Sequence, residues 1–426
     1  MMLPPTLLAT CLALLLAACS ADAPDASETA PGSSPSGGAK EVEDAGVAPF
    51  QRELLTLAFE AASKFPTFPH SKNRGRAQEE VLVACFELGL PKLALQFAPD
   101  TEGWRRGLAY ADYAYYCAKQ GVTKNVDRYL ELAEAVASEE SSDPNAQQWR
   151  IDKVRLKIAR AHAAMGRMEK AEEIGGAIEA TSKGAVDASW SQTVSSWVAE
   201  MDLEQAREEL AGITQTFENQ SLGEQYSSLL VLSALHGRFF SDEAFRAELE
   251  ERLLVRFFKL PPNLRLDAIA PMVGHYLDAE DLDGARNVIV RMAEILDGAR
   301  WRTEDKVPQM ARIAELHVDT GDEERARQEL QQALELYQSG REDIFDINRC
   351  ESLRPIALGF YKLGDREQGE GLLAVAVEEG VENPNARPRC DDLVATCVAL
   401  AARGVEPSPA LMARLREISA GLVDPW

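Results

Sequence analysis

The chain has 426 residues and a formal net charge of −24, with 69 acidic and 45 basic side chains. A chain this acidic repels the phosphates of nucleic acids, and no basic face compensates for that charge. We therefore expect no nucleic-acid partner.

The first residues form a short apolar leader. Leu7 to Ala18 is a run of 12 residues without a charged side chain, well short of the ~20 residues that a membrane-spanning helix needs. Its length is typical of the apolar region of a signal peptide. The run ends in Leu16-Ala17-Ala18-Cys19, which resembles the bacterial lipobox. That resemblance implies cleavage before Cys19 and lipidation of its thiol. The alternative is an ordinary secretory signal with Cys19 at the boundary by chance.

A polar segment follows the leader. Residues 20–46 are rich in Ser, Ala, Pro, Gly, Asp and Glu, and Val42 is their one apolar side chain larger than alanine. Such a segment buries too little surface to offset its chain entropy, so we expect a disordered tether. We predict a signal peptide at 1–18, the lipidated cysteine and tether at 19–48, and a folded body at 49–426.

The lipobox resemblance also implies a location. Ser20 follows the lipidated cysteine where an inner-membrane retention signal would place Asp, so the resemblance favours the outer membrane, facing the periplasm. Since anionic headgroups would repel the acidic body, the acyl chains of the anchor would be the membrane contact.

The body repeats one pattern of small residues and turns. A small residue on an apolar helix face is followed seven residues later by a turn and five residues after that by a second small residue. Glycine at the turn allows the left-handed conformation that ends a helix, and the small residues allow two helices to cross closely. The clearest copies are Ala159, Gly166 and Ala171; Ala314, Gly321 and Ala326; and Ala357, Gly364 and Gly369.

Less regular copies turn at Gly89, Gly121, Met201, Gly237, Glu280 and Gly404. We place Pro271 and Pro355 in first helical turns, where proline is tolerated. The pattern resembles the tetratricopeptide repeat, although successive turns are 32 to 45 residues apart and the family's usual period is ~34. The resemblance implies an all-α fold, an irregular α-solenoid of stacked antiparallel helical hairpins.

No catalytic or metal-binding motif is apparent in the sequence. The five histidines are His70, His162, His236, His275 and His317, and no two have a spacing that would make them metal ligands on one helix. No serine lies in a nucleophile elbow, and no glycine-rich loop follows a strand. We expect a non-catalytic protein without a cofactor or metal.

The cysteines pose a question of pairing. Cys350 and Cys390 each follow an arginine at the start of a first helix in consecutive repeats, so a disulfide between them or two separate thiols are both open. Cys85 and Cys117 are open to the same two interpretations. Cys390 and Cys397 are seven residues apart, about 10 Å along a helix, which is too far for a bridge.

A tyrosine cluster is the densest group of aromatic residues. Tyr110, Tyr113 and Tyr116 lie near one helix face, as core packing requires, whereas Tyr115 points elsewhere. Tyr115 either packs against a neighbouring helix or lines a binding groove.

Stacked helix pairs present an extended surface that typically binds peptides or proteins. The sequence therefore predicts a membrane-anchored scaffold or adaptor in the bacterial envelope whose protein or peptide partner contacts it with basic or polar residues. The alternative is a lipoprotein that holds a solute, peptide or glycan in a concave groove.

Overall fold

The fold is all-α. The computed structural model describes residues 42–426 except 145, 177, 179–197, 199–200 and 257–259, and the described residues contain no strand. Cys19 and most of the predicted tether therefore lie outside the described residues. Among the helices that are described, none has the length and apolar content that a membrane span requires.

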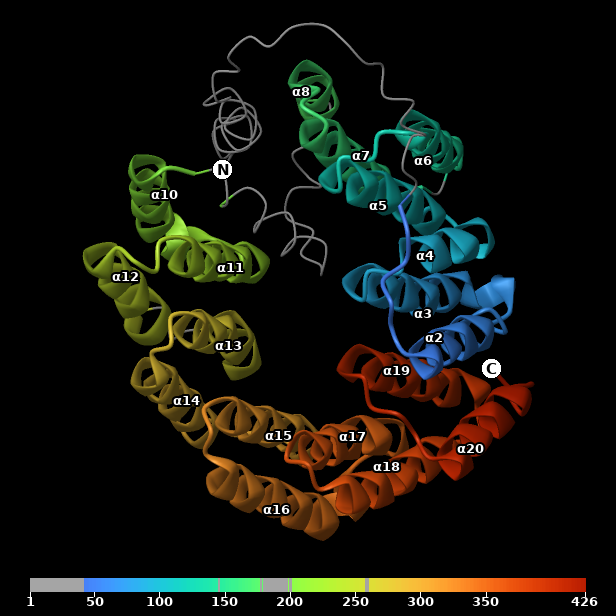
Figure 1. Cartoon of the computed structure of the whole chain (residues 1–426), viewed down its shortest axis with the longest axis vertical. Coiled ribbons are helices and arrows are strands. Elements are labelled where there is room, and N and C mark those ends of the chain that lie inside the picture. The colour runs from blue at the N-terminus through green and yellow to red at the C-terminus, as the bar shows by residue number, and fades with distance from the viewer. Residues whose placement is uncertain (1–41, 145, 177, 179–197, 199–200, 257–259) are drawn as a thin grey trace, which may run out of the picture. The chain divides into compact units, whose positions relative to one another are not determined.

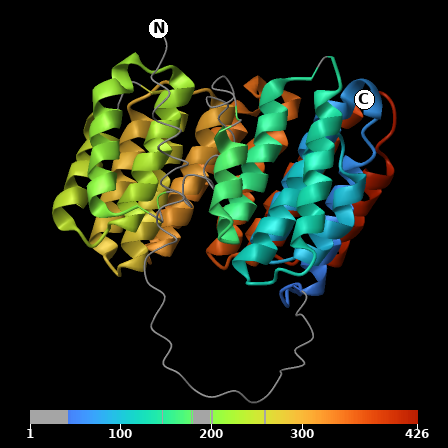
Figure 2. The same cartoon turned by 90° about the horizontal axis from the view of Figure 1, so that it is seen from above.

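The chain forms two compact units rather than one continuous body. The first unit takes in the described parts of Met1–Val47, Thr67–Ser189 and Ala199–Met201, and the second those of Ala48–Pro66, Trp190–Val198 and Asp202–Trp426. The helical-repeat domain predicted at 49–426 stays a prediction, and its described residues fall into both units. In each unit the helices run side by side with their axes roughly aligned (Figure 2).

The first unit begins within the segment predicted as tether. Val42 is 6% exposed, Ala45 donates a backbone hydrogen bond of 2.7 Å to Gly89, and the Lys92 amide donates to Asp44 Oδ1 at 2.6 Å. Residues 42–47 therefore belong to the folded unit, because their backbone and the one large apolar side chain find partners there. The helices of this unit are α3 (Thr67–Glu87), α4 (Pro91–Phe97), α5 (Arg105–Lys119), α6 (Val126–Ser141), α7 (Gln148–Ala164) and α8 (Met168–Gly176), with the 3₁₀ turn η2 (Ala98–Asp100).

The second unit contains most of the helix pairs. Its elements are α2 (Pro49–Ala62), α10 (Leu203–Thr216), η4 (Phe217–Asn219), α11 (Leu222–Arg238), α12 (Glu243–Glu250), the π-helical turn η5 (Glu251–Arg256), α13 (Pro262–Asp278), α14 (Leu282–Asp297), α15 (Thr303–Asp319), α16 (Glu323–Gly340), η6 (Arg341–Asp343), α17 (Asp346–Lys362), α18 (Arg366–Val381), α19 (Ala386–Arg403) and α20 (Pro409–Ala420). Helices α13, α15 and α17 lie in one row and α14, α16 and α18 in another (Figure 1). Each helix of the first row packs against its successor along the chain, and α15 also packs against α17.

The turns between paired helices share one backbone geometry. Gly166, Gly321 and Gly364 have φ of +70°, +77° and +79°. At Gly321, its own N–H bonds to the Val318 carbonyl at 3.0 Å and the next N–H, of Asp322, bonds to the His317 carbonyl at 2.8 Å. These two bonds satisfy carbonyls that the end of α15 would otherwise leave unpaired. Glycine suits this turn because the left-handed conformation costs it no steric strain.

The small residues lie buried where the paired helices cross. Ala314 and Ala326 belong to one buried cluster, and Ala159 and Ala171 to another. Gly369 allows a close crossing, because a Cβ built there would lie 3.0 Å from the Ala357 carbonyl oxygen and 2.8 Å from Tyr361. The spacing of small residues thus has a direct packing cause in these pairs.

Two predictions about helix ends are wrong. Gly237 lies within α11, where its missing side chain makes room for the ring of His275, and a Cβ there would lie 2.6 Å from His275 Nε2. Pro271 and Pro355 lie inside α13 and α17 rather than in their first turns. Both helices begin earlier than expected, since burial of their apolar faces outweighs the hydrogen bond that each proline removes.

Candidate interaction site at the start of α17

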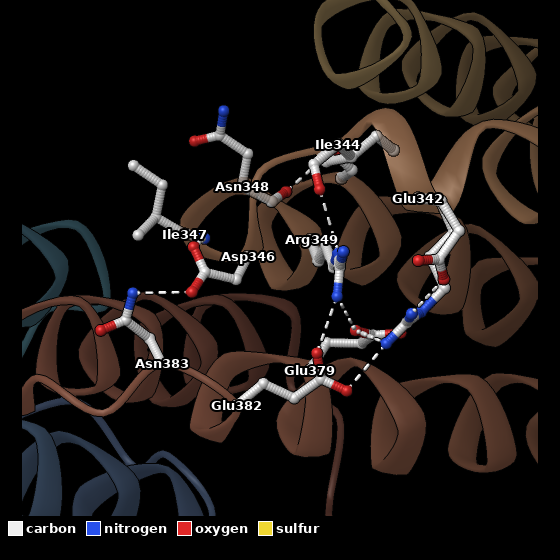
Figure 3. A network of polar contacts seen from close by, with 11 residues as sticks. Glu342, Ile344, Asp346, Ile347, Asn348, Arg349, Glu379, Glu382 and Asn383 are labelled. Carbon is white, nitrogen blue, oxygen red and sulfur yellow. Dashed lines mark hydrogen bonds and ion pairs between the residues drawn. The ribbon is translucent and has the colours of Figure 1, made fainter.

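A short connection between α16 and α17 carries a network of polar contacts (Figure 3). Residues Arg341–Asp343 form η6, and Asp346 opens α17. Between these two polar stretches Ile344 is 1% exposed and joins the buried cluster that underlies α15 to α18. Burial of Ile344 fixes the connection to the body of the unit, so the side chains around it have defined positions.

Two arginines from this connection meet carboxylates at the end of α18 (Figure 3). Arg341 donates from Nε to Glu379 Oε1 at 2.6 Å and from Nη2 to Glu379 Oε2 at 2.8 Å. Arg349 donates to Glu382 Oε2 at 2.7 Å and, through Nε, to the Ile344 carbonyl at 3.0 Å. A bidentate arginine–carboxylate pair is among the stronger and more directional polar contacts in proteins, so the network orders the connection.

Contacts and burial within the network raise the pKa values of Arg341 and Tyr337. The Glu379 side chain is only 6% exposed, and its carboxylate holds the pKa of Arg341 above the usual range through direct hydrogen bonds. Burial, followed by the effect of Glu379, raises the pKa of the adjacent Tyr337. Arg341 is therefore charged, and Tyr337 neutral, throughout the physiological pH range.

The first turn of α17 is held from α18 as well. Asp346 accepts a hydrogen bond of 2.9 Å from Asn383 Nδ2 and one of 2.8 Å from the Ile347 amide. A carboxylate at this position also suits the positive end of the helix dipole. In Figure 3 the Ile347 side chain points away from the arginines and glutamates.

Two apolar side chains project from this ordered segment into solvent. Phe345 is 66% exposed and Ile347 is 44% exposed. The neighbouring Glu342 and Asp343 are exposed as well. We call Phe345, Ile347, Glu342 and Asp343 the α17 patch. It joins apolar surface to negative charge, the combination that suits a partner segment with both apolar and basic side chains.

Of the two alternatives for Cys350 and Cys390, the structure has separate thiols. Cys350 and Cys390 are both buried and free. Cys350 Sγ lies 3.9 Å from Thr396 Oγ1 on α19, and Thr396 is six residues beyond Cys390, or about 9 Å along the helix. Cys390 Sγ instead donates to the Ala61 carbonyl of α2 at 3.3 Å. The offset between α17 and α19 thus directs the two thiols to different partners. Cys85 and Cys117 are buried as well, and the Cys117 thiol is free.

Tyr115 lies between two helices of the first unit. The Arg160 guanidinium of α7 is 3.6 Å from the centroid of the Tyr115 ring, and the ring is half-buried. The contact is a cation–π interaction. Tyr115 therefore packs against a neighbouring helix, the first of the two alternatives.

Sequence reasoning missed a buried polar chain in the second unit. His236 Nδ1 lies 3.0 Å from His275 Nδ1, and His236 Nε2 lies 3.3 Å from Glu250 Oε1. Tyr276 also donates a hydrogen bond to Glu250 Oε1. Because a carboxylate only accepts, His236 Nε2 carries its proton, and the two facing Nδ1 atoms share another. Burial lowers the pKa of His275 to about 4, so His275 is neutral at physiological pH.

Two glycines in the sequence mark the close contacts of this buried polar chain, Gly237 and Gly284. Gly237 makes room for His275, and a Cβ built at Gly284 would lie 2.2 Å from the Tyr276 ring. A glycine inside a helix next to a histidine indicates a close approach by another side chain. The repeat spacing instead predicted a turn at Gly237.

The described residues contain no group of three or more His, Cys, Asp or Glu side chains arranged to hold a metal ion. No protein-family model matches the chain, and neither a curated protein nor a solved structure is similar to it.

Proposed function

We propose that this chain is a lipid-anchored, non-catalytic scaffold of tetratricopeptide-like helical hairpins in the bacterial envelope, and that the α17 patch binds a partner protein. The observation that carries the proposal is the patch itself, with Phe345 66% and Ile347 44% exposed on a segment ordered by the Arg341–Glu379 contacts. An apolar surface that is ordered before binding loses little entropy when a partner docks.

The shared turn geometry supports the repeat part of the proposal. The same left-handed residue and pair of carbonyl contacts recur at Gly166, Gly321 and Gly364, and stacked helix pairs of this kind offer long surfaces for protein binding. The anchor part rests on the Leu16–Cys19 lipobox resemblance and on the polar segment that follows it.

The charge and the apolar side chains of the α17 patch indicate which kind of partner segment would bind there. Glu342 is 86% exposed although it pairs with Arg341 Nη1 at 2.8 Å, and Asp343 beside it is exposed too, within a chain of net charge −24. Positive side chains on a partner would be attracted over several ångströms, and an apolar side chain would cover Phe345 and Ile347. The partner segment is therefore apolar and basic, such as one face of an amphipathic helix.

Affinity capture of the full-length protein from detergent-solubilised envelopes tests this function. We expect a discrete partner that the Phe345→Ser/Ile347→Ser double variant loses by at least ~10-fold, the loss that a binding hot spot produces. The matched control is Leu282→Ser/Val290→Ser, which removes exposed apolar side chains from α14 and should leave capture unchanged. Equal capture by the wild-type protein and the patch variant would refute the assignment of the site.

A further inference from the structure

A second feature of the second unit, away from the α17 patch, is a cavity of about 260 Å³. It lies among the π-helical turn η5, the start of α13 and the end of α14, and it is lined by Leu254, Pro262, Arg265, Arg291, Glu294 and Ile295. The volume is close to the lower end of the range for small-molecule sites. Its lining is mixed, with three charged side chains against an apolar wall.

Arg265 is the unusual side chain of this cavity. Its Nε is buried without a hydrogen-bond partner, and its guanidinium forms no ion pair with any residue that the structure describes. Burial lowers the pKa of Arg265, as expected for a cation removed from water without a carboxylate beside it. A half-buried guanidinium normally has a negative partner, and in a chain with 69 acidic residues such partners are abundant.

The helix that carries Arg265 also begins without a negative group. At the N-terminus of α13 no side chain caps the helix, and its first turn contains no acidic residue. The unpaired N–H groups and the helix dipole therefore add positive potential near the guanidinium. The guanidinium and the start of α13, whose Pro262 lines the cavity, thus both favour an anion.

The remaining charges limit that anion to a single charge. Arg291 already forms an ion pair with Glu294 on α14, so these two side chains nearly cancel. The carboxyl end of α14, where Gly298 caps the helix and lines the cavity, contributes negative potential. A dianion such as phosphate would be repelled by Glu294 and by this helix end, whereas a carboxylate can pair with Arg265 alone.

We propose that this cavity binds a small monocarboxylate with a branched apolar group. The carboxylate pairs with the Arg265 guanidinium, and the apolar group lies against Leu254, Pro262 and Ile295. A free organic acid and the C-terminus of a peptide share this chemistry. The site is independent of the proposed partner site, because no side chain of the α17 patch lines the cavity.

Calorimetric titration of the full-length protein in detergent tests the site. The probes are N-acetyl-leucine, its uncharged analogue N-acetyl-leucinamide, and inorganic phosphate. We expect saturable binding of N-acetyl-leucine only, weakened at least ~10-fold by Arg265→Gln and less by Arg265→Lys, since a charge-assisted pair is lost in the first and kept as a point charge in the second. Arg286→Gln, on the outer part of α14, is the matched control and should bind as the wild type does.

Glu294→Gln keeps the proposal testable should Arg265→Gln fail to fold. Removal of this negative charge should tighten binding several-fold. A longer peptide that ends in a free leucine carboxylate distinguishes the two sources of the ligand. If this peptide binds, the site is for peptide C-termini. If it does not bind while N-acetyl-leucine does, the site is for free acids. The proposal would be overturned if N-acetyl-leucine showed no saturable binding at about 10 mM, or if the amide bound equally well. Tighter binding of phosphate, or weaker binding of N-acetyl-leucine by Glu294→Gln, would overturn it too.

Discussion

Among the buried polar groups of this protein, Asp392 is the one whose effect on stability can be tested most directly. It lines a small cavity between α17, α18, α19 and α20 that has room for about one water molecule. Its Oδ1 is 4.0 Å from Arg354, and its Oδ2 has no hydrogen-bond partner among the described residues. Burial raises the pKa of Asp392 to about 6, because the distant Arg354 contact does not replace the water around the charge.

This shift predicts how stability depends on pH. The folded protein binds the Asp392 proton more tightly than the unfolded chain, so the contribution of Asp392 to stability is present below pH 3.8 and is lost as pH rises toward about 6. Asp392→Asn should therefore increase the free energy of unfolding at pH 7.5 by about 2 kcal/mol and have little effect at pH 3.5. Denaturant titrations at the two pH values measure this difference.

The neighbouring Asp391 supplies the control, because it is exposed and Asp391→Asn makes the same change of charge. A similar gain from both variants would show that net charge, rather than burial of Asp392, is responsible.

At the scale of single residues, few of the side-chain contacts could be predicted from the sequence. The five cysteines were recognised as buried or paired, yet the choice between a Cys350–Cys390 bridge and separate thiols depends on the offset between α17 and α19. The His236–His275 contact joins residues 39 positions apart and requires knowledge of how α11 and α13 cross. Neither the offset nor the crossing is encoded in any local pattern.

Helices and turns were more predictable, because their signals are local. The glycine turns and small crossing residues follow from the backbone geometry of one hairpin and recur with each copy. Glu280 shows the same geometry without glycine: its φ is +57°, its N–H bonds to the Leu277 carbonyl at 3.0 Å, and the Asp281 N–H bonds to the Tyr276 carbonyl at 2.9 Å. A residue with a Cβ is strained in this conformation.

Glu280→Gly should therefore increase the free energy of unfolding by about 0.5–1 kcal/mol, and Gly321→Ala should decrease it by about 1 kcal/mol. A Cβ at Gly321 would meet no atom within 4 Å, so the loss would report the backbone alone. Thermal melts of the two variants measure both effects.

Gly371→Ala, inside α18 and equally free of close neighbours, is the control and should stabilise the helix. A stabilising effect of Gly321→Ala, or a destabilising one of Glu280→Gly, would contradict the account of the turns.

The packing of α2 differs from that in a simple repeat array, in which each hairpin contacts only the next hairpin along the chain. Helix α2, near the start of the chain, packs against α19 near its end. Gln51 Nε2 donates to the Ala401 carbonyl at 2.7 Å, and Phe65 lies 4.9 Å from Trp426 between ring centroids. In a simple repeat array each hairpin contacts only its neighbours, so local periodicity could not predict this contact or the division into two units.

The function proposed for the whole molecule combines a membrane anchor with a partner-binding surface. The proposed anchor would depend on Cys19, because the two acyl chains of a diacylglyceryl group on its thiol would bury enough methylene groups to hold a protein at a bilayer. A body that is itself acidic would gain little from anionic headgroups. Loss of the thiol should therefore release the protein without changing the α17 patch.

Labelling of cells with radioactive palmitate, followed by membrane fractionation, is the most direct test. The wild-type protein should incorporate label and sediment with membranes. Cys19→Ala should incorporate none, appear in the soluble fraction, and still capture the partner that the Phe345→Ser/Ile347→Ser variant loses. A Cys19→Ala protein that remains labelled, or that sediments with membranes as the wild type does, would contradict the account.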